Sequence, residues 1–212
     1  MTTLLVTAFE PYGEWAQNAS WLALVELTRN LPDAPQVVTR RYPVDFAVVK
    51  RRLAEDLAAN YDFALHLGQA PGSAQIRLEA IGLNLGGVPA SRLASASGST
   101  TPGETMSGDL MTLCDDGPLA YRSQLPLADW AARLRQEGIP TQVSYHAGTY
   151  LCNALLYWSH YFAERQQLKT RSTFIHLPLD PSQVADAQGE MAALPASISA
   201  EAVRRLLPIL EG

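Results

Sequence analysis

Short apolar runs alternate with amphipathic stretches along almost the whole chain, and this alternation restricts the fold more than any other feature. Strands are predicted at residues 3–9, 36–42, 62–67, 141–145 and 173–177. Helices are predicted after Asn18 and Asp45, which suit the N-cap position, and at residues 127–136, 151–163 and 199–210. Strands separated by helices of this length pair in parallel, with crossover helices on both faces of the sheet. We therefore expect one α/β sandwich domain over residues 1–212.

The segment 88–108, VPASRLASASGSTTPGETMSG, interrupts this pattern because Ser, Gly, Thr, Ala and Pro dominate it. A loop of this length is uncommon inside a compact domain, where it is usually functional or disordered. Two interpretations stay open. The favoured one is an exposed, flexible Ser/Gly-rich insertion, and the other is a mobile cover over a site.

Charge and composition exclude several classes of partner. The chain of 212 residues carries 16 basic and 21 acidic side chains, a formal net charge of −5, which argues against binding to nucleic acids or anionic membranes. No stretch approaches the about 18 consecutive apolar residues of a membrane span. Residues 1–5 also lack the basic segment of a signal peptide. We expect a cytoplasmic globular protein.

The tract around Cys152 is the most informative for chemistry. It reads YHAGTYLCNALLYW over residues 145–158, in which a β-rich segment ends, Ala-Gly-Thr makes a bend and a helical pattern begins near the cysteine. A thiol in the first turn of a helix meets unsatisfied N–H groups and the positive end of the macrodipole, and both favour the nucleophilic thiolate. The alternative is a buried and inert cysteine. Cys114 lies in a polar turn without such an arrangement, and we treat it as incidental.

A cysteine nucleophile needs a histidine base and a third group that orients the base. Of the 4 histidines, His176 is favoured because it ends a strand pattern, where sites collect in α/β folds. His66 fits a core position equally well, and His160 is expected at a helix surface. His146 is close to Cys152 only in sequence.

Glu79 is the candidate for the third group. It stands in an otherwise apolar strand pattern, AQIRLEAIGLN, and a carboxylate is costly to bury there unless it is paired. An edge-strand position facing water, or a structural pair with Arg77 or another basic residue, stays an equal alternative. The 2 cysteines and the spacing of the histidines fit no zinc site, and no phosphate-binding glycine loop follows a strand. We therefore predict no metal and no cofactor.

Several ordered tracts together resemble the pyroglutamyl peptidase I (pyrrolidone-carboxylate peptidase) family of cysteine peptidases, over nearly the full chain. The matching tracts are LLVTAFEPYG with NASW at residues 4–13 and 18–21, GQA at 68–70, DGP at 116–118, AGTYLCN at 147–153 and FIHLP at 174–178. The chain departs from the family pattern at Ala8, Tyr12 and Ala80, where Gly, Phe and Arg are usual.

The resemblance implies a twisted α/β/α sandwich with a largely parallel central sheet. It implies a triad in which Cys152 is the nucleophile, His176 the base and Glu79 its orienting partner. The implied enzyme is a cofactor-free exopeptidase that removes an N-terminal pyroglutamyl residue from peptides through a thioester acyl-enzyme. The family also implies a homotetramer.

The lactam of a pyroglutamyl group is small and uncharged, so its pocket should be apolar with a few polar anchors. By resemblance, Phe9 and Tyr12 flank the ring, Gln69 takes the polar position, and Tyr150 and Leu151 form another wall. Core packing is the alternative for Phe9. Two rival functions stay open: a hydrolase of the same fold for another N-acyl amide, and a non-catalytic binding protein.

Overall fold

A six-stranded sheet lies at the centre of the computed structural model, which describes residues 1–87, 110–187 and 190–211. Its strands are β1 (Thr3–Phe9), β2 (Gln36–Tyr42), β3 (Phe63–Gln69), β4 (Ile76–Glu79), β7 (Thr141–Ser144) and β8 (Arg171–Leu177), in the spatial order β2-β1-β3-β8-β4-β7. A second, antiparallel pair is formed by β5 (Ile81–Leu83) and β6 (Ala120–Arg122). The predicted insertion at 88–108 lies outside the described residues.

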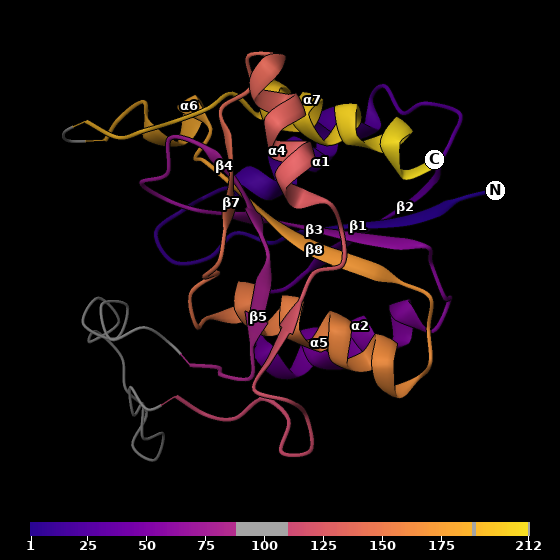
Figure 1. The fold of residues 1–212 in the computed structure, drawn as a ribbon. Helices are drawn as coiled ribbons and strands as arrows, with labels where there is room; N and C mark the ends of the chain where they lie inside the picture. The colour runs from indigo at the N-terminus through magenta and orange to yellow at the C-terminus, as the bar shows by residue number, and fades with distance from the viewer. Residues whose placement is uncertain (88–109, 188–189, 212) are drawn as a thin grey trace, which may run out of the picture.

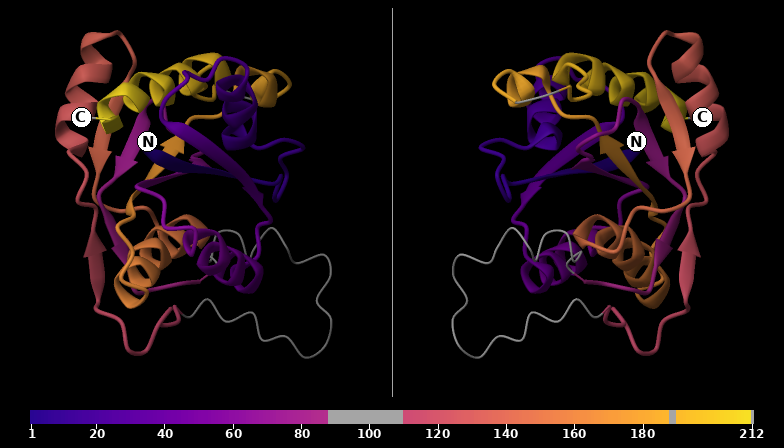
Figure 2. Two further views of the ribbon diagram at one scale, coloured as in Figure 1. Left: turned by 90° about the vertical axis from the view of Figure 1, so that its right-hand side faces the viewer. Right: turned by 90° about the vertical axis from the view of Figure 1, so that its left-hand side faces the viewer.

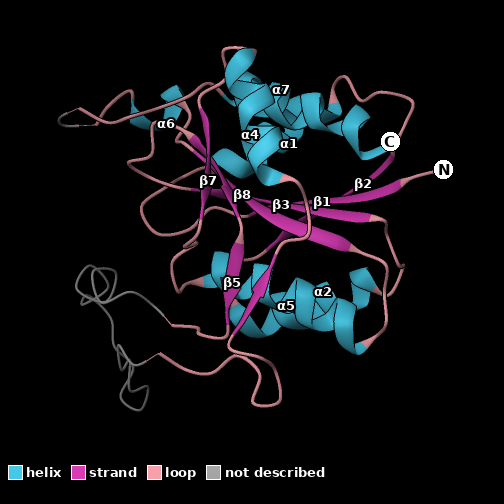
Figure 3. Cartoon of the chain, in the orientation of Figure 1, coloured by secondary structure: helices cyan, strands magenta, loops and turns pink. Residues whose placement is uncertain are grey.

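Helices cover both faces of the sheet (Figures 1 and 3). They are α1 (Ala19–Thr28), α2 (Phe46–Leu57), α4 (Leu127–Gln136), α5 (Leu151–Arg165), α6 (Pro181–Val184) and α7 (Ala196–Leu206), and a 3₁₀ helix follows at Leu207–Glu211. Seen along the sheet, α1, α4 and α7 lie on one side, and α2 and α5 on the other (Figure 2).

The two faces of β1, β3 and β8 enter two separate hydrophobic cores. On β1, Leu4 and Val6 pack with the α1, α4 and α7 layer, and Leu5 and Phe9 pack with the α2 and α5 layer. This alternation is the two-residue period of a strand with both faces covered. It explains why the strands read as continuous apolar runs in the sequence.

The predicted α/β class is confirmed, and the sheet is mostly parallel, but its direction changes at one edge. Strands β2, β1, β3 and β8 run in parallel, whereas β4 is antiparallel to β8 and β7 is parallel to β4. Only residues 70–75 connect β3 to β4. A parallel return needs a crossover of about a dozen residues or more, so β4 runs back in the opposite direction beyond β8.

Both predicted N-caps are confirmed. The Asn18 side chain accepts a hydrogen bond from the Ser20 N–H at the start of α1, and the Asp45 side chain accepts one from the Val48 N–H of α2. The helix predicted at 199–210 begins earlier, at Ala196, and ends as the 3₁₀ turn. Within the part of the chain that the structure describes, none of the helices combines the length and the apolar character that a membrane crossing requires.

Candidate active site

Cys152 is the second residue of α5, and α5 begins where β3 and β8 end. The chain reaches it from β7 through a turn at Gly148, whose φ of 78° is a conformation that glycine adopts without strain. No side chain caps the first turn of α5 among the described residues. The N–H groups of that turn, and the positive end of the helix dipole, are therefore directed at the Cys152 side of the helix.

Asn153 fastens this helix end to the neighbouring β5 strand. Its side chain is fully buried, accepts a hydrogen bond from the Leu83 N–H at 2.8 Å, and donates to the carbonyl oxygens of Leu83 at 2.9 Å and Leu85 at 2.8 Å. One amide thus satisfies three backbone groups. Cys152, the residue before Asn153, is therefore positioned by a helix end that is hydrogen-bonded to the backbone of Leu83 and Leu85.

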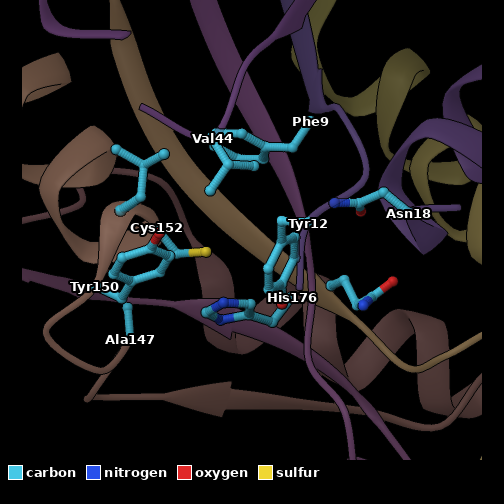
Figure 4. A pocket seen from close by; sticks show the side chains of 10 residues that line it. Phe9, Tyr12, Asn18, Val44, Ala147, Tyr150, Cys152 and His176 are labelled. Atoms are coloured by element: carbon cyan, nitrogen blue, oxygen red, sulfur yellow. The ribbon is translucent and has the colours of Figure 1, made fainter. Parts of the chain in front are cut away.

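His176 lies near the end of β8 and faces the same layer as α5. Its ring is 4.7 Å from that of Phe174, centroid to centroid, and it faces Cys152 across the site (Figure 4). Burial lowers the pKa of His176. The charge and hydrogen bond of Cys152, followed by those of Glu79, outweigh burial and raise this pKa to about 9. The imidazole is therefore held as an imidazolium beside the sulfur at neutral pH.

Glu79 supplies the second negative partner of His176. Its Oε1 atom is 2.8 Å from His176 Nδ1, and the carboxylate is completely buried. In the antiparallel pairing of β4 with β8, Arg77 lies opposite His176. Glu79 comes two residues after Arg77, so it shares the same face and reaches the histidine diagonally. The structure thus places Glu79 in a pair with His176, and not with Arg77 or at the solvent.

Gly68 leaves the space that Phe174 and Cys152 occupy. A Cβ atom at Gly68 would stand 2.4 Å from Phe174 Cζ and 3.3 Å from Cys152 Sγ. Any larger residue would therefore push the Phe174 ring or the cysteine out of place. This close approach explains why the Gly-Gln-Ala tract at 68–70 begins with glycine.

A small pocket opens at Cys152 and His176 (Figure 4). It is lined by Phe9, Tyr12, Asn18, Val44, Gln69, Ala147, Tyr150, Leu151, Cys152 and His176. Its volume of about 130 Å³ is far below the roughly 300 Å³ at which pockets for drug-sized ligands begin. The pocket therefore fits an acyl group the size of a single residue.

Gln69 lines the pocket and carries an unpaired hydrogen-bond donor. It is the last residue of β3 and only 4% exposed. Its Oε1 accepts from the Ala19 N–H at 2.9 Å and from Gln183 Nε2 at 2.8 Å. Its own Nε2 is buried and has no partner among the described residues. A buried donor of this kind is costly to leave unpaired, and a ligand with a hydrogen-bond acceptor would satisfy it.

The structure brings the residues proposed from the sequence together. The five proposed binding residues, Phe9, Tyr12, Gln69, Tyr150 and Leu151, all line the pocket with Cys152 and His176, and Glu79 lies behind the histidine. Their roles stay predictions. Sequence reasoning missed Val44, Ala147 and the pocket-lining position of Asn18. Val44 follows Pro43 between β2 and α2, and no motif marks it.

The other histidines do not reach the pocket. His66 is a core residue, bonded to Thr7 and Ser159. His160, expected at a helix surface, is half-buried: its Nε2 is buried, and its ring packs against Tyr121. His146 is exposed and accepts from the Gly148 N–H. Within the described residues, no group of histidine, cysteine or acidic side chains suits a metal ion.

Fold and site geometry together define a class, an α/β cysteine hydrolase that accepts a small acyl group. The family model described as pyroglutamyl peptidase matches residues 2–208 of the chain. A pyrrolidone-carboxylate peptidase of Bacillus cereus (strain Q1) is 30% identical over 193 residues, which cover 90% of this chain and 84% of that protein.

Solved structures agree with this match. The pyrrolidone carboxyl peptidase of Fervidobacterium islandicum AW-1 is 31% identical, with a TM-score of 0.86 and coverage of 100% of this chain and 99% of the other. The enzyme from Thermococcus litoralis is 27% identical, with a TM-score of 0.83 and coverage of 99% and 93%. The chain belongs to the pyroglutamyl peptidase family. It is a cysteine peptidase that removes N-terminal pyroglutamate, as the sequence analysis predicted.

Proposed function

We propose that Cys152, His176 and Glu79 carry out this removal as nucleophile, acid–base and orienting carboxylate. The observation that carries the proposal is the continuous contact from the buried Glu79 carboxylate through His176 to Cys152 at one small pocket. Glu79 binds Nδ1, which leaves Nε2 of the ring to serve the sulfur and the substrate.

In the first half-reaction the Cys152 thiolate attacks the carbonyl carbon that joins pyroglutamate to the next residue. The negative oxygen that forms lies beside the first turn of α5, whose N–H groups stabilise it. His176 gives its proton to the leaving amine nitrogen, the C–N bond breaks, and a thioester on Cys152 remains. In the second half-reaction His176 takes a proton from water, the resulting hydroxide attacks the thioester, and pyroglutamate leaves as the thiolate is regenerated.

The pocket selects the acyl group by shape and by one hydrogen bond. Phe9 and Tyr12 flank the lactam ring, and Tyr150 and Leu151 form the opposite wall. The free Nε2 of Gln69 donates to the ring carbonyl oxygen. A prolyl group has no ring carbonyl and carries a charged amine, so it would leave this donor unpaired.

The direct test compares release of a fluorogenic amine from pyroglutamyl and prolyl amides. We expect release from the pyroglutamyl amide only. Preference for another N-acyl amide would instead assign a different substrate to the same chemistry. Binding of the pyroglutamyl amide without release would assign a non-catalytic protein.

We also propose an oligomeric state and a cellular compartment for this chain. We expect a homotetramer, and large apolar side chains on the surface support association: Leu119 is 90% exposed, Tyr145 66% and Met111 58%. A cytoplasmic location is supported by two cysteines that are both free, since a reducing compartment keeps the nucleophilic thiol available. Light scattering of the purified chain measures the subunit number.

A further inference from the structure

The orientation of the Gln69 side-chain amide is fixed by groups outside the pocket. Its Oε1 accepts two hydrogen bonds, one from the Ala19 N–H and one from Gln183 Nε2. A backbone N–H can only donate. If the Gln69 amide were turned by 180°, its NH₂ group would face two donors and its oxygen would face the pocket.

Gln183 is in turn held in a single orientation. Its Oε1 accepts from the Asp180 N–H at 2.9 Å, and its Nε2 donates to the Gln17 carbonyl oxygen at 3.1 Å as well as to Gln69. Both backbone groups have only one possible role, so the Gln183 amide cannot be reversed without two mismatched contacts. The main chain thus fixes the orientation of the Gln183 amide, and Gln183 in turn fixes that of the Gln69 amide.

The topology explains how Gln183 reaches this position. Gln69 ends β3 and pairs with Leu177, the last residue of β8. The chain leaves β8 there and forms the short helix α6, in which Gln183 completes a capping box with Asp180. Gln183 does not line the pocket at Cys152. Among the described residues, its hydrogen bond to Gln69 connects it to that pocket.

We propose that Gln183 is a positioning residue for substrate recognition, which holds the Gln69 amide with its NH₂ group toward the acyl pocket. The inference rests on the proposed function, in which this group donates to the lactam carbonyl. Gln183 thereby makes the pocket specific for an acyl group with an acceptor at that place. It takes no part in bond breaking.

The Gln183→Glu variant isolates this effect. A glutamate keeps an oxygen for the Asp180 N–H, so the capping box of α6 stays intact. The other carboxylate oxygen replaces the donor that faces Gln69 Oε1, so the Ala19 N–H alone holds the original orientation against a charged acceptor. The charged acceptor draws the Gln69 amide into the reversed orientation. An acceptor now meets the lactam carbonyl. Because the ring carbonyl takes no part in bond making or breaking, the loss falls on binding rather than on the chemical step.

The experiment measures KM and kcat on a pyroglutamyl amide for wild type, Gln183→Glu, Gln69→Ala and the double variant. We expect Gln183→Glu to raise KM by about tenfold or more, with kcat changed by less than about threefold. In the Gln69→Ala background the same substitution should change KM by less than about twofold. The Ser182→Ala variant is the matched control on α6, because Ser182 contacts the Asp180 cap and makes no contact with Gln69, and its KM should stay unchanged.

An unchanged KM in Gln183→Glu, or an equal rise with and without Gln69, overturns the role of Gln183 and leaves the proposed function standing. A wild-type protein that does not cleave the amide overturns the proposed function, and the role of Gln183 with it. Thermal unfolding shows whether Gln183→Glu is folded. If it is not, Gln183→Met takes its place, with an expected KM rise of about threefold that also disappears without Gln69.

Discussion

His176 lies between Cys152 and Glu79, and this position sets its pKa. Its ring is almost fully buried, which by itself disfavours the imidazolium. The interactions of the ring with Cys152 on one side and with Glu79 on the other outweigh burial and raise the pKa of His176. At neutral pH the ring therefore carries the proton that the proposed mechanism gives to the leaving amine.

The pH dependence of turnover follows from this proton. Below a pH of about 9 His176 is protonated and can act as the acid, and above it the proton is lost. We expect kcat/KM to fall as the pH rises through about 9. A rate profile over alkaline pH measures this limb directly. A profile that stays flat well above pH 9 would contradict the assignment of the acid to His176.

Glu79→Gln separates the charge of the carboxylate from its hydrogen bond. Glutamine can still accept from Nδ1 but carries no charge, so the pKa of His176 should fall and the alkaline limb should move to lower pH. We expect kcat to fall by about 100-fold or more, as for other orienting carboxylates. Glu201→Gln, which removes a surface ion pair, is the control and should keep wild-type turnover. An unmoved alkaline limb would remove Glu79 from the site.

At the scale of elements, the site depends on how the first turn of α5 is held. Asn153 satisfies three backbone groups of β5 and of the chain that follows it. The sequence marked this helix start through the Cys-Asn tract. It did not show what the asparagine contacts, because its partners are 68 and 70 residues away in the chain.

Asn153→Ala should cost about 2–4 kcal/mol of unfolding free energy, because it leaves buried backbone groups unpaired. It should also slow alkylation of Cys152, since the helix end moves away from His176. Urea unfolding and the rate of thiol labelling measure the two effects. Gln166→Ala, at the exposed end of the same helix, should stay within about 0.5 kcal/mol of wild type. Equal stability of the two variants would mean that Asn153 does not anchor α5.

Sequence patterns predicted long elements better than short ones. The strands β1 and β2 and the helix α4 have the predicted bounds. A buried apolar run marks β1, β-branched residues before Pro43 mark β2, and an apolar face marks α4. The four-residue helix α6 was not predicted, although Asp180 and Gln183 have the spacing of a capping box. A single turn has no periodicity to detect, so the contact of Gln183 with Gln69 could not be foreseen.

At the scale of the whole molecule, the alternation of strands and helices was sufficient to predict an α/β sandwich. The reversed direction of β4 and β7 was not predicted, since local patterns carry no information on strand direction. The meeting of Glu79, Cys152 and His176 was expected by resemblance to a family. Residue patterns alone left Glu79 open between three positions, because burial of a carboxylate depends on contacts with distant strands.

The interior also sets how the molecule responds to acid. His66 is fully buried, and Ser159 Oγ, which donates to the Leu155 carbonyl, accepts from its Nε2. Its Nδ1 must then accept from Thr7, so no position is left for a second proton. Burial, with a smaller contribution from His160, lowers the pKa of His66 to about 3, and burial lowers that of His160 to about 4.

An unfolded histidine titrates near pH 6.5, so below that pH the unfolded chain binds protons that the folded chain does not. The unfolding free energy should therefore fall with decreasing pH between about 6.5 and 4. His66 and His160 should each contribute about 1.4 kcal/mol per pH unit. Urea unfolding at several pH values should give a shallower slope for His66→Gln. The same slope in both proteins would contradict a neutral, buried His66.

The central claim is that Cys152 carries the pyroglutamyl group during turnover. Rapid acid quenching of the enzyme with a pyroglutamyl amide, followed by peptide mass spectrometry, locates the acyl group directly. We predict one pyroglutamyl group on the peptide that contains Cys152, none on the peptide that contains Cys114, and neither adduct nor amine release in Cys152→Ala. Sustained amine release by Cys152→Ala, or an acyl group on another residue, would contradict the account.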